Sequence, residues 1–221
     1  MSGQFIVVEG LEGAGKSTVV LALKTFLENQ GLDVLTIREP GGTGLGEAVR
    51  TWLCHTEEST PLDARTELLL FYAARVQLIQ ERILPALKRG QWVLADRFEW
   101  STFAYQGGGR GIDNTIIQAL SRFCVGDCQP DCIFYLDIPA EVGLQRIQKR
   151  GALDRIEQEP LAFFKKIEQS YKNLLHAALA HKTPSSAKQV YCINAALSES
   201  EVCHEVLEKM RHWLQLSATP T

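Results

Sequence analysis

The feature that most constrains the fold of this 221-residue chain is a glycine-rich segment near its start. Residues 10–17 read GLEGAGKS and match the pattern G-x-x-x-x-G-K-[ST]. Glycines let the backbone turn so tightly that successive N–H groups face one phosphate, while the lysine reaches the outer phosphates and the hydroxyl helps to hold Mg²⁺. The expected contacts to a nucleoside triphosphate are Gly10, Leu11, Glu12, Gly13, Ala14, Gly15, Lys16, Ser17 and Thr18.

The residues on either side of this segment favour a ligand site over an ordinary glycine-rich turn. Residues 4–9 form a short apolar run that is typical of a buried strand. After the segment, apolar residues recur at helical spacing and Gly31 follows as a stop signal. Strand, glycine turn and helix is the required order, because the helix N-terminus adds partial positive charge to the site.

Strand and helix patterns alternate along the rest of the chain. We expect strands at residues 33–38, 91–96, 131–137 and 189–194. Helices are expected at about 44–54, 63–89, 112–125, 140–150, 160–181 and 198–215, with Pro85 kinking or ending the second. Such alternation predicts one α/β domain over residues 1–221, with a P-loop NTPase-type parallel five-stranded sheet and helices on both faces.

Composition narrows the classes of partner. The net charge of −3 argues against a general nucleic-acid binder, and no apolar run is long enough to span a membrane. The first residues show no secretion signal, which predicts a cytoplasmic protein. The six cysteines include no C-x-x-C pair, so we expect reduced packing thiols instead of disulfides or a metal site.

Chemistry is expected where the predicted strands end, because parallel sheets bind ligands at the carboxyl edge. Asp96 closes an apolar strand, where it would meet Mg²⁺ together with Ser17. Arg97 follows directly, and a helix starting there would align it with Ser101 and Tyr105. A second helical pair, Phe71 and Arg75, offers an aromatic face for a base, although Phe71 taken alone is more typical of a core residue than of a ligand contact.

These residues bring the chain close to a known family. The segment 96–106, DRFEWSTFAYQ, resembles the thymidylate (dTMP) kinase signature D-R-[FYH]-x-x-S-x-x-A-[FY]. The segments REPGGT at 38–43 and LDRIE at 153–157, and the Phe71/Arg75 pair, resemble the same family in the same order. The resemblance implies a nucleoside monophosphate kinase domain that uses ATP and Mg²⁺ to phosphorylate the small molecule dTMP. It also implies a homodimer and a mobile lid at about residues 146–158.

The resemblance also implies roles for single residues. Phe71 would stack on thymine and Arg75 would contact the edge of the base, with Thr102 and Gln106 completing the hydrogen bonds. Glu12 would accept from the 3′-hydroxyl, and Tyr105 would crowd the 2′ position. The phosphate of dTMP would be surrounded by Arg38, Arg50 and Arg97. Glu39 and Ser101 are the remaining residues expected to bind the acceptor.

The chain differs from some members of the family it resembles in the residue expected to supply a cation to the transferring phosphoryl group. Similar eukaryotic members carry an arginine where this chain has Gly13, whereas bacterial members place basic residues in the lid. The chain is basic around that segment and so resembles the bacterial type, with Arg150 and Arg155 as candidate catalytic residues beside Lys16 and Arg97. Arg146 and Lys149 are expected to face solvent.

Two alternatives remain open from the sequence. Another P-loop nucleotide or deoxynucleoside kinase would share the fold, and a nucleoside kinase could use Glu39 as a base for a 5′-hydroxyl. A GTPase-like switch is disfavoured, because the chain has neither an N-K-x-D nor a D-x-x-G motif.

Overall fold

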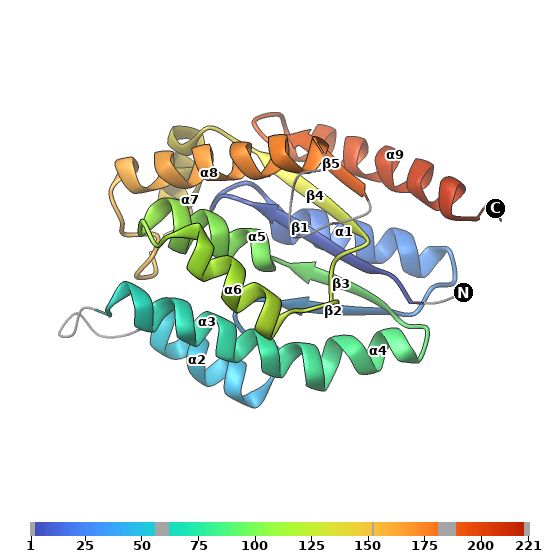
Figure 1. The fold of residues 1–221 in the computed structure, drawn as a ribbon. Helices are drawn as coiled ribbons and strands as arrows, with labels where there is room; N and C mark the ends of the chain where they lie inside the picture. The colour runs from blue at the N-terminus through green and yellow to red at the C-terminus, as the bar shows by residue number, and fades with distance from the viewer. Residues whose placement is uncertain (1–2, 56–61, 152, 181–188, 219–221) are drawn as a thin grey trace.

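The structure is a computed structural model that describes residues 3–55, 62–151, 153–180 and 189–218. Its centre is a five-stranded sheet in which every pairing is parallel, in the order β2-β3-β1-β4-β5 (Figure 1). The strands are β1 (Phe5–Gly10), β2 (Val34–Arg38), β3 (Trp92–Asp96), β4 (Cys132–Asp137) and β5 (Gln189–Asn194). The predicted strands and the predicted fold class are confirmed.

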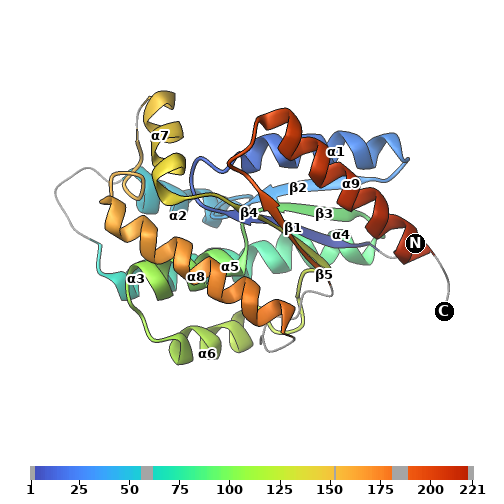
Figure 2. The same cartoon turned by 90° about the horizontal axis from the view of Figure 1, so that it is seen from above.

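Helices cover both faces of the sheet (Figure 2). One face carries α1 (Lys16–Asn29) and α9 (Glu199–Ala218), which also pack on each other. The other face carries α4 (Leu84–Lys88), α5 (Glu99–Thr102) and α8 (Leu161–Leu179). The remaining helices are α2 (Gly44–His55), α3 (Ala64–Leu78), α6 (Asn114–Cys124) and α7 (Ala140–Arg150). Strands covered on both sides carry long apolar runs, as residues 5–8 of β1 do, and all residues of β1 are buried.

The strand register determines which side chains meet at the carboxyl edge. Val8 pairs with Asp96, and Asp96 pairs on its other side with Arg38. The glycine-rich loop leaves β1 two residues beyond Val8, at Gly10. The loop, Asp96 and Arg38 therefore lie together at one end of the sheet, although they are far apart in the sequence.

The long helix predicted at 63–89 is divided in the structure. A π-helical turn, η1 (Ile79–Ile83), separates α3 from α4, and Pro85 lies in the first turn of α4. Proline has no N–H to donate to the carbonyl four residues earlier, and the wider turn just before it accommodates this loss. A second π-helical segment, η2 (Phe103–Gly109), continues α5 and carries Tyr105 and Gln106.

The cysteines are all free thiols. Nowhere in the described part of the chain do three or more potential metal-ligating His, Cys, Asp or Glu side chains gather. Across the described residues, no helix has both the length and the apolar character that crossing a bilayer requires.

Candidate active site

The glycine-rich loop wraps around the start of α1. Gly10, Gly13 and Gly15 have φ of 147°, 74° and 85°, a region that residues with side chains rarely adopt. Lys16 is the first residue of α1, and its Nζ donates to the carbonyl of Leu11 at 2.8 Å. Burial, reinforced by the charge of Arg97, lowers the pKa of Lys16 to about 8. The loop thus presents a lysine whose ammonium form is destabilised until an anion arrives.

Two glycines bring the loop against α7. A Cβ at Gly13 would stand 2.3 Å from the carbonyl oxygen of Gly143, and one at Gly143 would stand 2.5 Å from that of Glu12. In the same place Arg146 donates to the carbonyls of Gly13 at 3.3 Å and Ala195 at 2.8 Å. The expectation that Arg146 faces solvent is wrong, because α7 lies on the loop.

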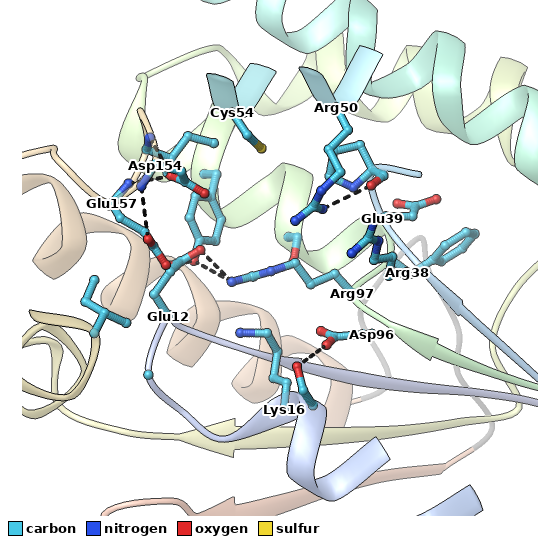
Figure 3. A pocket seen from close by; sticks show the side chains of 18 of the residues that line it. Glu12, Lys16, Arg38, Glu39, Arg50, Cys54, Asp96, Arg97, Asp154 and Glu157 are labelled. Atoms are coloured by element: carbon cyan, nitrogen blue, oxygen red, sulfur yellow. Dashed lines mark hydrogen bonds and ion pairs between the residues drawn. The ribbon is translucent and has the colours of Figure 1, made fainter. Parts of the chain in front are cut away.

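Asp96 and Ser17 are adjacent at the carboxyl edge. The Ser17 hydroxyl donates to Asp96 Oδ2 at 3.1 Å (Figure 3). A hydroxyl and a carboxylate beside a phosphate loop are hard oxygen donors, and Mg²⁺ is commonly held by one or two such groups together with substrate phosphates. The residues present therefore fit a magnesium site.

Arg97 lies at the centre of the site in a strained conformation. Its φ is 72°, and its guanidinium donates to the Gly10 carbonyl at 2.9 Å and to Glu12 at 2.6 Å. Tyr105 donates to the other Glu12 oxygen. Although burial raises the pKa of Glu12, the charges of Arg97 and Lys16 outweigh it and lower that pKa, so Glu12 is ionised. Figure 3 shows Arg97 reaching across the cavity to Glu12.

Two supports of this arginine were not predicted from the sequence. Glu9 is fully buried and accepts from the Phe98 N–H at 2.9 Å and from the Ser101 hydroxyl at 2.7 Å. Tyr171 of α8 donates to Glu9 at 2.9 Å and also accepts from Arg97 at 3.4 Å. Burial raises the pKa of Glu9. Ser101 thus contacts the support of Arg97, as well as Arg97 itself at 3.1 Å.

Arg75 and Glu39 form a buried ion pair next to Arg97. Their side chains are 1% and 5% exposed, and Arg75 donates to both carboxylate oxygens of Glu39 at 2.6–3.1 Å. Arg75 also donates to the Thr102 hydroxyl at 2.9 Å. Phe71, one turn earlier on α3, is half-buried and lines the same cavity.

Arg38 and Arg50 line the cavity beside Glu39 (Figure 3). Arg38 is half-exposed and pairs with Glu47 at 3.2 Å, whereas Arg50 donates to the Pro40 carbonyl at 3.2 Å. Unlike Arg75, neither is locked by a buried carboxylate, so both can turn toward an anion in the cavity.

The two candidate lid arginines differ in position. Arg150 is 63% exposed, lines the cavity and pairs with Glu157. Arg155 points away from the cavity: it donates to Glu67 at 2.5 Å and to the Leu53 carbonyl at 2.8 Å. Lys149 is exposed, as expected.

One cavity of about 490 Å³ collects most of the predicted site. Among the predicted residues, Gly10, Leu11, Ala14 and Arg155 do not line it. The cavity is also lined by residues that were not predicted from the sequence, among them Cys54, Asp154 and Glu157. Asp154 and Glu157 lie within the LDRIE segment that resembles the family. Nucleotide-sized ligands occupy pockets of this volume.

The fold and the site define the class of protein: a P-loop nucleotide-binding protein with a second, arginine-lined pocket beside the loop. Comparison with known proteins is more specific. The profile of the family described as Thymidylate kinase matches residues 8–204. A thymidylate kinase of Legionella pneumophila (strain Corby) is 51% identical over 79% of this chain and 82% of its own length. One of Idiomarina loihiensis is 42% identical over 97% of this chain and 100% of its own. The chain belongs to the thymidylate kinase family.

Proposed function

We propose that the chain transfers the γ-phosphoryl group of ATP to dTMP, giving dTDP for dTTP synthesis. The observation that carries this proposal is one cavity lined by the P-loop lysine, by the buried Arg75 and by the partly buried Arg97. The lysine side suits the triphosphate, and the arginine side suits a phosphorylated acceptor. Family membership agrees with this division.

The acceptor needs no strong general base. The second pKa of a phosphate monoester is about 6, so dTMP is mostly a dianion at pH 7 and already nucleophilic. Transfer instead needs in-line positioning and neutralised charge. Arg97 holds the acceptor phosphate and Lys16 the outer phosphates of ATP. Mg²⁺ held by Ser17 and Asp96 would supply further neutralisation.

The thymine ring would occupy the part of the cavity between Phe71, Arg75 and Gln106. Phe71 offers a face for stacking, which is worth about 1–3 kcal/mol per base. Thymine presents a carbonyl acceptor at position 4 and an N–H donor at position 3. Arg75 donates to the first and the Gln106 amide oxygen accepts from the second. Tyr105 and Glu12 lie beside the sugar in this arrangement.

The remaining cation needed at the transferring phosphoryl group comes from the lid segment, about residues 146–158. This segment is part of a single domain. Gly13 leaves no space for a side chain in the loop, since its Cβ would meet the backbone of α7. Arg150 already lines the cavity from the end of α7, and its guanidinium, which is mostly exposed, can leave its pair with Glu157 for a phosphoryl group. Arg150 is therefore the stronger of the two candidates.

The adenine of ATP fits a second cavity of about 270 Å³ on the other side of the loop. Arg146 and Thr18 line it, together with Leu197, just before α9, and Cys203 within α9. The planar guanidinium of Arg146 is held by backbone carbonyls, which leaves its face available for stacking on the ring.

A homodimer in the cytoplasm is part of the same proposal. Exposed apolar side chains on two neighbouring helices, α3 and α6, support the dimer: Leu69, Ile116 and Phe123 are 56%, 53% and 88% exposed. Exposed large apolar side chains are typical of subunit interfaces.

The alternative, a deoxynucleoside kinase with Glu39 as base, is disfavoured because Arg75 occupies both carboxylate oxygens. A coupled ADP-release assay with dTMP, dUMP, CMP and thymidine tests the proposal. We expect dTMP to be the best acceptor and thymidine, which lacks the phosphate for Arg97, to be inactive. Preferred turnover of thymidine or CMP would contradict it.

A further inference from the structure

Glu67 of α3 stands outside the cavity but touches one of the residues that line it. Its carboxylate is 1% exposed and accepts from the Gln106 amide nitrogen, Oε1 to Nε2, at 2.8 Å. Arg110 donates to both oxygens, at 3.1 and 3.2 Å, and Arg155 donates to Oε2 at 2.5 Å. Every group around Glu67 in this network is a donor.

Such surroundings keep Glu67 an acceptor. Burial by itself raises the pKa of Glu67, but the hydrogen bonds from Arg110, Arg155 and Gln106 outweigh it and lower that pKa. An ionised carboxylate has no hydrogen to donate. Gln106 must therefore turn its NH₂ group toward Glu67, which leaves its carbonyl oxygen on the other side.

We infer that Glu67 is a positioning residue that selects thymine over cytosine by fixing the orientation of the Gln106 amide. Gln106 is 1% exposed and lines the cavity next to Thr102 and Arg75. With the nitrogen held by Glu67, the oxygen faces the base, and Arg75 presents a donor beside it. Thymine matches this order with a donor at N3 and an acceptor at position 4, whereas cytosine presents the reverse.

This inference rests on the proposed function, because it assigns how the same pocket reads the base of its acceptor. It differs from the roles above in that Glu67 touches neither substrate nor reacting atoms. Its effect passes through the orientation of one amide, so it predicts a change in selectivity and not only in rate.

The substitution Glu67→Gln tests the orientation directly. The new amide would place its oxygen at the Oε2 site, because two arginine nitrogens donate there and only one, Arg110 Nε, donates to the Oε1 site. Its NH₂ would then face Gln106 and force that amide to turn, bringing nitrogen toward the base. We expect the ratio of kcat/KM for dTMP to that for dCMP to fall at least about tenfold.

Arg110→Met is the matched control. It removes a partner of Glu67 from the same buried network but leaves the carboxylate facing Gln106, so the ratio should stay near the wild-type value. A Glu67→Gln protein that loses activity toward both acceptors in proportion, or keeps the wild-type ratio, overturns the inference. If the wild-type protein itself does not phosphorylate dTMP, the proposed function fails instead.

A second measurement does not depend on the folding of Glu67→Gln. Neutron diffraction of the wild-type protein with dTMP locates the deuterium atoms of the Gln106 amide. Deuterium directed at Glu67, with the oxygen near thymine N3, supports the inference. The opposite orientation overturns it.

Discussion

The two sides of the cavity hold their cations in different ways. On the acceptor side, Arg75 and Arg97 are each fixed by a carboxylate, Glu39 and Glu12, at 2.6 Å. On the phosphoryl side, Lys16 donates only to a backbone carbonyl, and Arg150 pairs with Glu157 but is itself 63% exposed. Cations fixed by largely buried carboxylates suit a pocket that binds a preformed anion. A cation held by one carbonyl, or by a pair in which the arginine is mostly exposed, can respond to charge that develops during transfer.

The largest effect is expected on the phosphoryl side. Lys16→Met should lower kcat by roughly 10²–10³-fold or more, because it removes a cation aimed at the transferring charge. The fold should persist, since Lys16 has no carboxylate partner to leave unpaired. Steady-state kinetics together with thermal melting check this. A Lys16→Met protein with nearly wild-type kcat would remove the loop from the mechanism.

On the acceptor side, Arg97→Met should weaken dTMP binding far more than ATP binding. Loss of a buried, charge-assisted contact costs ~2–5 kcal/mol, roughly a thirtyfold to several-thousandfold change in Kd. The melting temperature should also fall, because Glu12 keeps its buried charge without its main partner. Separate calorimetric titrations of each nucleotide decide the matter, and equal losses for both would contradict the assignment to the acceptor.

The two sides of the cavity also differ in how much of each could be predicted from the sequence. The phosphate loop is contiguous, and Asp96 directly precedes Arg97 at a strand end, so their proximity could be predicted. The partners of the acceptor side are distant: Glu39 and Arg75 are 36 residues apart, and Glu9 and Tyr171 are 162 apart. No local pattern says which carboxylate will meet which donor once helices pack on a sheet.

Arg146 is a further residue whose surroundings could not be predicted from the sequence. From the sequence it was expected to face solvent. Close contact of Gly13 with Gly143 brings the phosphate loop onto α7, and the loop carbonyls then bind the guanidinium. Both glycines can be read from the sequence, but no sequence pattern predicts that they contact each other.

The two lid arginines allow the comparison to be tested within one segment. Arg155 is fixed by the buried carboxylate of Glu67, whereas Arg150 is mostly exposed. Arg150→Met should lower kcat about 10- to 100-fold with little change in dTMP affinity, as expected for an interaction formed only in the transition state. Arg155→Met should instead lower the melting temperature, since it removes a donor from buried Glu67. Kinetics and melts of both variants on matched preparations test this. The reverse pattern would exchange the roles of the two residues.

The smallest expected effect, proton uptake, tests the comparison most directly. With a pKa of about 8, Lys16 is about half protonated in the free protein at pH 8. The phosphates of ATP favour its charged form and raise that pKa, so binding at pH 8 should take up about half a proton, and almost none at pH 6.5. Arg75 and Arg97 are charged throughout, because burial, which lowers an arginine pKa, is outweighed by their paired carboxylates. Binding of dTMP should therefore take up much less.

Calorimetry in buffers of different ionisation enthalpy measures these protons, since the observed heat changes linearly with the number taken up. Lys16→Arg is the control, because arginine stays charged at pH 8 and its uptake on ATP binding should vanish. Equal uptake with ATP and dTMP would mean that the acceptor phosphate reaches Lys16 as closely as the donor does. The division of the cavity into a fixed and a responsive side would then fail at its central residue.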